Sequence, residues 1–554
     1  MGKFNKLYTE KGWNLSGVPW RKYPRPQLKR DSFYSLNGEW EFSVGNESFD
    51  KIINVPFCPE SILSGVNQIF DEKDTLYYRK SFSLPEGFNK GRVILNFGAV
   101  DQKCFVVLNG RTVGSHSGGY DAFSFDITDF LSKENILVVA VKDSLSDKIL
   151  PYGKQSRNRG GMWYTCVSGI WQSVWLESVP EKYIKAIKID VTLNGADVIF
   201  DGIENGSVAV DGKQYAIENS VAHIDVENPV NWTPENPHLY YFTALSGEDK
   251  IESYFALRTL RIDGNKLLLN DKPYFFHGLL DQGYFSDGIF TPSCEEQYTD
   301  DILKMKSLGF NMLRKHIKVE PEYFYYECDR LGMIVFQDMV NNSRYSFVRD
   351  TVLPTFSLVK KDDRKIHKSI EGRNGFIRGM EKTVKQLYNH PCICQWTIFN
   401  EGWGQFCADD MYDKLKGYDS SRFIDSASGW FKAEKNDFNS LHIYFKPLKA
   451  DMSEKPLFIS EFGGYSYKIK GHSFNTENTY GYGKFDSREK FVSAIRNLYE
   501  NQLIPLKEKG LCASVYTQVS DVEDETNGLL TYDRKIMKIK PEEFIEISNR
   551  LKEI

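Results

Sequence analysis

The second half of the 554-residue chain alternates short apolar runs with helix-like segments, and this alternation restricts the fold more than any other feature. Eight apolar runs of strand length follow one another after residue 261. The predicted strands cover residues 274–281, 311–317, 333–339, 392–400, 422–428, 440–445, 456–462 and 512–520. Eight β-then-α units in a segment of this size predict a (β/α)8 barrel, with a doubly wound sheet as the alternative.

The first 260 residues predict β-structure throughout. Alternating runs such as RVILNFGAV and NILVVAVKD, separated by turn signals, predict a β-sandwich over residues 1–180. The runs AIKIDVTL and HLYYFTALSG predict a smaller immunoglobulin-like sandwich over residues 181–260. We therefore expect three domains, of which the barrel over residues 261–554 is the last.

Composition and charge exclude several classes of protein. The net charge is −5 and no block of basic residues occurs, which argues against a nucleic-acid partner. No apolar run approaches the ~18 residues of a membrane span, and the first residues lack the apolar centre of a secretory signal. The nine cysteines are scattered and none forms a C-x-x-C pair, as expected for reduced thiols in a cytoplasmic protein.

The helix after the first barrel strand has a start signal. Ser293 and Glu296 match the S-x-x-E capping box, so we expect this helix to open at Ser293. Tyr298, Ile302 and Met305 would then share its buried face.

Polar residues follow the carboxyl ends of most of the predicted barrel strands. In a (β/α)8 barrel these ends form one rim, where function collects. The polar strand-end residues are Asp281, Gln282, Arg314, Lys315, His316, Lys318, Gln337, Asp338, Asn400, Glu401, His442, Tyr444, Glu461, Tyr516, Gln518 and Asp521. Residues 340–373 contain no clear strand and predict a long loop on the same rim, of undefined role.

Glu401 and Glu461 end two similar runs, WTIFNEGWG and PLFISEFGG. A carboxylate at the end of an apolar strand costs free energy unless it is partnered or used. One such Glu is explained by an ion pair or a helix cap, but two on strands that face each other across a barrel mouth predict a pair. A retaining glycosidase needs two carboxyl groups roughly 5–5.5 Å apart, one to protonate the departing oxygen and one to attack the anomeric carbon.

These two runs resemble the signatures of glycoside hydrolase family 2, which contains β-galactosidases, β-glucuronidases and β-mannosidases. LNGEWEF, SGIWQSVWLE, WTPENPHLY and CDRLGMIVFQDM are similar to other segments of the family, in the same order, so the resemblance spans essentially the whole chain. It implies a jelly-roll, sugar-binding sandwich, an immunoglobulin-like sandwich and a catalytic TIM barrel.

The resemblance also implies roles for single residues. Glu401 would be the general acid/base and Glu461 the nucleophile. Asn400 would hydrogen-bond the sugar 2-hydroxyl, and Tyr444 would sit beside the nucleophile and steady its charge. The other expected substrate contacts are Asp281, His316, Asp338, Trp403, His442, Tyr516 and Gln518.

Two tryptophans of the first domain have two interpretations. Trp163 and Trp171 either reach the sugar site or belong to the sandwich core, and the core is the favoured interpretation.

The sugar is less well defined than the reaction. Glucuronidases of the family carry an Asn-x-Lys element after the last barrel strand, which is missing from TQVSDVEDETNGLLTYDRKIMKI. The acidic run in this segment, residues 521–525, would repel a uronate if it faced the site. We therefore expect a β-galactosidase. A β-glucuronidase, a β-galacturonidase, a β-mannosidase-like enzyme and a non-catalytic carbohydrate-binding protein are the alternatives.

The end of the second barrel strand bears on both the uronide and the galactoside assignment. Arg314, Lys315 and Lys318 offer cations for a carboxylate, unless the lysines face solvent or pair with Glu320. Large galactosidases of the family have Arg and then His three residues later, whereas His316 follows Arg314 by two. No ligand cluster calls for the magnesium ion of the large galactosidases, so no metal or cofactor is expected. A glycoside is the expected partner, and a homo-oligomer of undefined size is a further implication.

Overall fold

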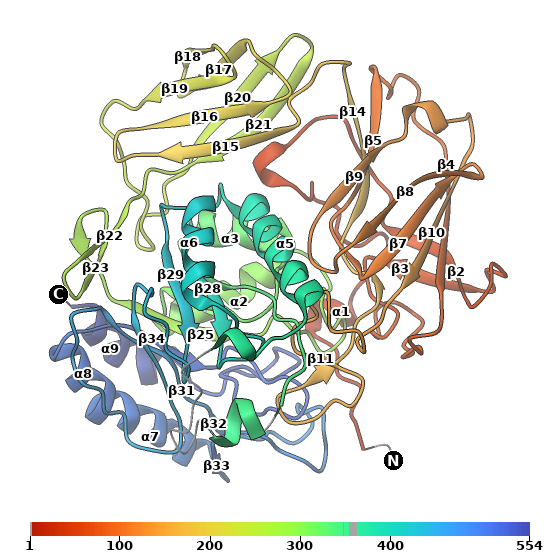
Figure 1. Ribbon diagram of the computed structural model, residues 1–554. Coiled ribbons are helices and arrows are strands. Elements are labelled where there is room, and N and C mark those ends of the chain that lie inside the picture. Colours follow the sequence, from red (N-terminus) through yellow and green to blue (C-terminus); the bar gives the residue numbers. More distant parts are fainter. Residues whose placement is uncertain (1–2, 347, 354–362, 554) are drawn as a thin grey trace.

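The computed structural model describes residues 3–346, 348–353 and 363–553 and divides into two β-sandwiches and a barrel (Figure 1). The first sandwich, in orange, lies to the side of the barrel, and the second, in yellow, lies above it. The barrel itself runs from green to blue. The predicted order of sandwich, sandwich and barrel is confirmed.

The first sandwich packs a four-stranded sheet against a six-stranded sheet. The smaller sheet has the order β1 (Phe33–Ser35), β14 (Val174–Val179), β5 (Arg92–Phe97) and β9 (Phe123–Asp126). The larger has the order β3 (Lys51–Val55), β2 (Gly38–Val44), β4 (Leu76–Phe82), β10 (Asn135–Lys142), β7 (Lys103–Leu108) and β8 (Arg111–Ser117). In β10 every second side chain is buried, because one face of the strand covers a core that contains Trp40 and Tyr78.

The second sandwich has seven strands in two sheets. Its sheets are β15 (Ala186–Val191), β16 (Gly195–Asp201) and β19 (Val221–Asp225), and β18 (Lys213–Ile217), β17 (Gly206–Val210), β20 (Tyr240–Ser246) and β21 (Asp249–Phe255). Seven antiparallel strands of this length match the immunoglobulin-like prediction. A small sheet of β22 (Leu260–Asp263), β23 (Lys266–Leu269) and β24 (Lys272–Pro273) leads into the barrel.

The barrel contains all eight predicted strands, each within three residues of its predicted bounds. In spatial order they are β29 (Phe423–Ser428), β28 (Ile393–Asn400), β27 (Ile334–Asp338), β26 (Met312–Lys315), β25 (Phe276–Asp281), β34 (Leu511–Thr517), β31 (Leu457–Gly463) and β30 (Asn439–Ile443). The paired strands are parallel, and β29 lies beside β30, so the sheet is a nearly closed barrel rather than a doubly wound sheet. Nearly every strand residue is buried because helices cover the outside.

The long helices of the barrel cover its outer surface (Figure 1). They are α2 (Glu296–Ser307), α3 (Glu322–Leu331), α5 (Ile370–Leu387), α6 (Ala408–Tyr418), α7 (Arg488–Leu498) and α9 (Pro541–Lys552). None of the helices in the described part of the chain combines the length and apolarity needed to cross a membrane.

The predicted start of α2 is wrong, although its buried face is confirmed. The helix begins at Glu296, three residues late, and the buried Ser293 hydroxyl has no hydrogen-bond partner among the described residues. The reason is a long-range contact. The Glu295 carboxylate accepts the backbone N–H of Lys22 at 2.8 Å, which fixes the chain ahead of the helix.

The predicted loop over residues 340–373 is described only in part. It contains a π-helical turn (Val348–Val352), a 3-10 turn (Asp363–Lys365) and the first turn of α5. Residues 347 and 354–362 lie outside the described part of the chain.

One segment of the first sandwich extends to the barrel mouth, and we call residues 151–168 the sandwich loop. Its short strands β11 (Gln155–Ser156) and β12 (Tyr164–Thr165) pair in parallel. The backbone N–H groups of Tyr152 and Gly153 donate to the carbonyl of Asn341, in the segment after β27. The barrel rim is therefore built from two domains.

Candidate active site

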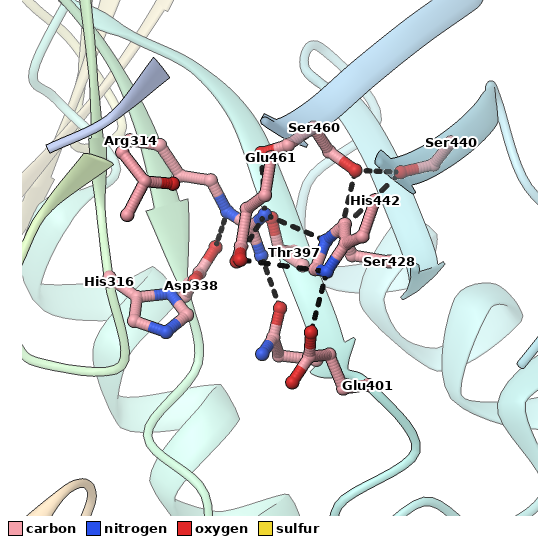
Figure 2. Close-up of polar contacts among 12 residues, drawn as sticks. Arg314, His316, Asp338, Thr397, Glu401, Ser428, Ser440, His442, Ser460 and Glu461 are labelled. Carbon is pink, nitrogen blue, oxygen red and sulfur yellow. Dashed lines mark hydrogen bonds and ion pairs between the residues drawn. The ribbon is translucent and has the colours of Figure 1, made fainter. Parts of the chain in front are cut away.

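Glu401 and Glu461 face each other at the carboxyl ends of β28 and β31, with His442 of β30 beside both (Figure 2). One carboxylate oxygen of each Glu and one ring nitrogen of His442 lie within 4.8 Å of one another. This is close to the separation of a retaining pair, roughly 5–5.5 Å, and below the roughly 6.5–9.5 Å of an inverting pair. The structure therefore brings together the two carboxylates that the repeated strand-end pattern singled out.

A tight turn after β28 directs Glu401 into the mouth. Glu401 has a positive φ of 52°, an uncommon conformation for a residue with a side chain, and its N–H donates to the carbonyl of Ser428 at 2.9 Å. A Cβ atom on Gly402 would lie 2.2 Å from the ring of Phe431, so only glycine fits there. The sequence Asn-Glu-Gly is thus what the turn requires.

Glu461 is held as a carboxylate by its neighbours. The Tyr444 hydroxyl donates to Oε2 at 2.8 Å, and Arg314 Nη1 lies 3.3 Å from Oε1. Burial raises the pKa of Glu461, but the positive charges of His442 and Arg314 outweigh burial and leave this pKa below its ordinary value. An ionised, buried carboxylate is the state that a nucleophile needs.

Arg314 of β26 connects the groups around Glu461 and was not among the predicted contacts. Its side chain is fully buried, and it donates to Asp338 Oδ1 at 3.0 Å and to Asn400 Oδ1 at 2.8 Å. Because the Asn400 oxygen is occupied, the amide N–H groups of Asn400 are the donors left for a sugar hydroxyl. The alternation of β26 was the available signal, since Arg314 shares its face with the predicted His316.

Asp338 and His316 form a second buried pair next to Arg314. His316 Nδ1 lies 2.7 Å from Asp338 Oδ2. Burial raises the pKa of Asp338, but Arg314 and His316 lower it to about 2. Burial lowers the pKa of His316 itself, which favours a neutral ring. Both residues lie at the site, and their contact with substrate stays a prediction.

His442 joins the two glutamates. Its Nδ1 lies 2.9 Å from Glu401 Oε1 and 3.6 Å from Glu461 Oε2, and its Nε2 lies 3.1 Å from the hydroxyl of Ser428. Although these three groups are near enough to hold a cation, the Arg314 guanidinium would repel it from Glu461. The arrangement fits proton transfer better than metal binding, and the absence of a metal stays a prediction.

Two predicted contacts do not face the glutamate pair, because their side chains leave the strands on the other side. Asp281 binds Lys315 at 2.6 Å, within a buried cluster in which Lys315 and Lys318 each lie 2.9 Å from Glu320. The interpretation that these lysines pair with Glu320 is therefore the one observed.

Tyr516 is the second predicted contact that points away. It packs against Phe462 and Tyr499, toward the helical layer, with ring centroids 5.6 and 6.2 Å away. Its place in the outer layer gives it a packing role.

Aromatic rings wall the mouth on the side of the sandwich loop. Trp403 packs edge-on against Trp163 at 5.2 Å between ring centroids, and Tyr345 contacts both rings. The assignment of Trp163 to the sandwich core is wrong, because docking of the sandwich loop carries it to the barrel. Trp171 is buried where the first sandwich meets the barrel, 5.0 Å from the ring of Phe290.

Gln518 belongs to a polar network at the end of β34. Its Nε2 donates to Asn527 Oδ1 at 2.8 Å and also to Glu525, and its Oε1 accepts from Gln282 at 2.9 Å. Its amide is therefore committed within the protein before any sugar binds. Its role as a substrate contact stays a prediction.

The acidic run at residues 521–525 is occupied by internal partners. Asp521 binds Lys538 at 2.6 Å, and Glu523 binds Arg159 at 3.3 Å. The remaining two acids accept hydrogen bonds, Asp524 from Asn475 at 2.7 Å and Glu525 from the Tyr164 hydroxyl at 3.1 Å. A uronate at the mouth would therefore not meet four free negative charges.

Comparison with known families agrees with this geometry. The family model "Glycosyl hydrolases family 2, sugar binding domain" matches residues 58–180, and "Glycosyl hydrolases family 2, TIM barrel domain" matches residues 260–476. The chain belongs to glycoside hydrolase family 2. The resemblance of the sequence to this family is thereby confirmed.

Curated members of family 2 are similar over most of this chain. A β-galactosidase of Thermoanaerobacter pseudethanolicus is 25% identical over 79% of this chain and 60% of its own length. A putative β-glucuronidase of Formosa agariphila is 24% identical over 85% of this chain and 61% of its own length. The chain thus spans about three fifths of the length of these relatives.

Solved structures of family 2 share the fold. A β-D-glucuronidase from Dictyoglomus thermophilum superposes with a TM-score of 0.74 at 18% identity, covering 96% of this chain and 98% of the other. A β-galacturonidase from Eisenbergiella tayi gives a TM-score of 0.69 at 19% identity, again covering 96% and 98%.

Proposed function

We propose that the protein is a retaining exo-β-glycosidase, which hydrolyses a terminal β-linked sugar through a covalent glycosyl-enzyme intermediate. The observation that carries the proposal is the pair of opposed carboxylates, Glu401 and Glu461, with ligand oxygens within 4.8 Å of each other and of His442. Among the residues that the structure describes, a fully buried guanidinium contacts Glu461 and none contacts Glu401. This asymmetry supports different roles for the two groups.

In the first step the carboxylate of Glu461 attacks the anomeric carbon, while the carboxyl proton of Glu401 passes to the departing glycosidic oxygen. The bond between that oxygen and the sugar breaks, and the aglycone leaves as an alcohol. The Tyr444 hydroxyl and Arg314, both bound to Glu461, hold the attacking group in place.

In the second step Glu401 acts as a base. Once Glu461 is glycosylated its negative charge is gone, so a negative charge on Glu401 is no longer opposed. Glu401 takes a proton from a water molecule, and the water attacks the anomeric carbon and releases Glu461. Each step inverts the anomeric carbon, so the product keeps the β-configuration.

The sugar follows from weaker observations than the reaction. The sequence favours a β-galactoside, and relatives named β-galactosidase support it. A β-uronide is the second candidate, because the acidic run that opposed it is internally paired and because other relatives are named β-glucuronidase. The intact glutamate pair argues against a purely carbohydrate-binding role.

The test is a panel of 4-nitrophenyl β-glycosides (galactoside, glucuronide, galacturonide, mannoside and arabinoside) assayed from pH 5 to 8, with the released sugar followed by proton NMR. We expect at least one substrate to be cleaved and the β-anomer to appear first. Appearance of the α-anomer, or no cleavage of any member, would contradict the proposal.

The roles of the two glutamates are separated by leaving-group dependence. Glu401→Gln should still release 2,4-dinitrophenol in a rapid burst, because this leaving group needs no proton, and should then stall in the second step. Azide, which needs no general base, should restore turnover and give a β-glycosyl azide. Glu461→Gln is the matched control, because it should show neither the burst nor rescue to the β-azide.

A further inference from the structure

Lys154 of the sandwich loop stands at the barrel mouth on a fixed backbone. The N–H of the preceding Gly153 donates to Asn341, and a Cβ atom on Gly153 would lie 2.8 Å from the carbonyl oxygen of Ile317, just after β26. The carbonyl of Lys154 accepts the N–H of Tyr164 at 3.1 Å. The loop thus contacts the segments that follow β26 and β27. Lys154 directly follows the residue that makes these contacts.

The ammonium group of Lys154 differs from the other cations around the mouth. Arg314, Lys315, Lys318, Arg159 and Lys538 each form an ion pair with an acidic side chain. Lys154 is half-buried, and within the described residues its ammonium group has no hydrogen-bond or ion-pair partner. A half-buried cation without a partner is uncommon, since partial desolvation has to be offset by some anion.

The charge of Lys154 acts on three groups of the site. It lowers the pKa of Glu461 and of Glu525, and it adds to the lowering of the pKa of His316 by burial. Glu461 belongs to β31, Glu525 follows β34 and His316 follows β26, so these groups surround the space between the nucleophile and the sandwich loop. Together with the docking of the loop beside β26 and β27, this places Lys154 next to the nucleophile of the proposed reaction.

We propose that Lys154 is a specificity-determining residue that binds a carboxylate on the terminal sugar, which makes a β-uronide the preferred substrate class. The inference rests on the proposed function, because the sugar must sit at the glutamate pair. The described residues provide no acidic partner for the Lys154 ammonium group. A carboxylate on the sugar would supply one through a charge-assisted hydrogen bond. A galacto-configured uronide satisfies both this requirement and the galactoside preference of the sequence.

This assignment puts the recognition of the carboxylate in the first sandwich. The expected Asn-x-Lys element after the last barrel strand is absent, and Lys315 and Lys318 are bound to Glu320. Lys154 precedes the acidic segment at residues 521–525, which follows β34, by about 370 residues in the chain. A cation from another domain thus takes the place of a motif that the barrel lacks.

The test compares substrates that differ only in the carboxylate. Wild type, Lys154→Met, Lys154→Arg and the exposed control Lys142→Met are assayed on 4-nitrophenyl β-galacturonide, β-glucuronide, β-galactoside and β-glucoside. Loss of a charge-assisted hydrogen bond predicts about a 100-fold fall in kcat/KM on the cleaved uronide for Lys154→Met and less than about 3-fold on the matching neutral sugar. Lys154→Arg should retain most of the uronide activity, and Lys142→Met should equal wild type.

A binding measurement keeps this inference separate from the catalytic proposal. Free galacturonate and glucuronate should raise the Tm of Glu461→Gln, and the effect should vanish when Lys154→Met is added. Equal losses on charged and neutral substrates would overturn the role of Lys154. So would cleavage of a neutral galactoside by an enzyme that neither cleaves uronides nor binds uronates. If no glycoside is cleaved but uronate binding requires Lys154, the catalytic proposal and the substrate preference fail, and only the uronate-binding role of Lys154 is supported.

Discussion

Two pairs of buried carboxyl groups, one at the barrel mouth and one in the first sandwich, have opposite surroundings. At the barrel mouth, Glu461 and Asp338 are bound to Arg314, and the pKa of each lies below its ordinary value. In the first sandwich no cation contacts Glu60 or Asp143 among the described residues. Burial raises the pKa of Glu60 to about 8 and that of Asp143 to about 7, and both oxygens of Asp143 lack a hydrogen-bond partner.

The difference shows that burial alone does not make a catalytic carboxylate. Burial disfavours the charge on all four of these groups. Among them, within the described part of the chain, only Glu461 and Asp338 contact a guanidinium that restores the charge, and Glu461 also accepts from a tyrosine hydroxyl. Glu60 and Asp143 have raised pKa values, but the two do not form an opposed pair like Glu401 and Glu461. A perturbed pKa marks a functional site only together with geometry.

The largest expected contrast is in turnover. Glu461→Gln should lower kcat by at least about 10⁴-fold on every cleaved substrate, because the covalent step loses its nucleophile. Glu60→Gln, which changes a buried carboxyl group outside the mouth in the same way, should stay within about 3-fold of wild type. Steady-state assays with matched circular dichroism spectra check both. Similar losses in the two variants would erase the distinction between the regions.

Arg314→Gln should leave Glu461 buried without a guanidinium beside it, as Glu60 and Asp143 are in the first sandwich. Without the guanidinium the pKa of Glu461 rises, so the acid limb of kcat/KM should move to higher pH while kcat falls roughly 10²–10³-fold. The pH–rate profile is the measurement. Arg422→Gln is the matched control, since Arg422 is a buried arginine that binds Asp419 at 2.8 Å. It should lower stability and leave the acid limb in place.

Asp338→Asn should destabilise the fold at neutral pH. Removing one partner from a buried ion pair leaves Arg314 undercompensated, for an expected loss of about 3 kcal/mol in the free energy of unfolding. Asp338 has a folded pKa of about 2, below its unfolded value. Its contribution is therefore present above about pH 4 and is lost as the pH falls toward 2. Urea unfolding at pH 7 and pH 3 should show a smaller difference between variant and wild type at the lower pH.

Glu60→Gln should raise the free energy of unfolding, whereas Asp338→Asn should lower it. The folded pKa of Glu60 is about 8, above the unfolded value, so the wild-type fold loses stability as the pH rises from about 4.5 to 8. Glutamine carries no charge, and the variant should gain on the order of 2 kcal/mol at pH 8 and nothing at pH 5. Urea unfolding at the two pH values measures it. A gain of equal size at both would show that charge is not the cause.

The parts of the molecule that follow from local patterns were predictable from the sequence. The apolar runs placed all eight barrel strands because buried parallel strands are apolar on both faces. The repeated ending of β28 and β31 placed Glu401 and Glu461. Tyr516 was misjudged because strand periodicity is two, and a one-residue ambiguity reverses the face.

Long-range contacts account for the rest. The start of α2 is fixed by the contact between Glu295 and Lys22, which no local signal contains. Trp163 and Lys154 reach the mouth through docking of one domain on another, and such contacts leave no mark on spacing or periodicity. Arg314 was visible as a strand-end residue, but its several partners come from separate strands.

The sandwich loop has a consequence for the order in which the chain is made. Thr165 and Arg159 contact Glu523, which leaves the ribosome 358 and 364 residues after them. During synthesis the loop therefore cannot form its contacts with Glu523 until the last barrel strand and the segment after it have emerged from the ribosome. A nascent chain that stops earlier has both sandwiches and most of the barrel but an unfinished mouth. The mouth is thus completed only after the segment that follows β34 has been made.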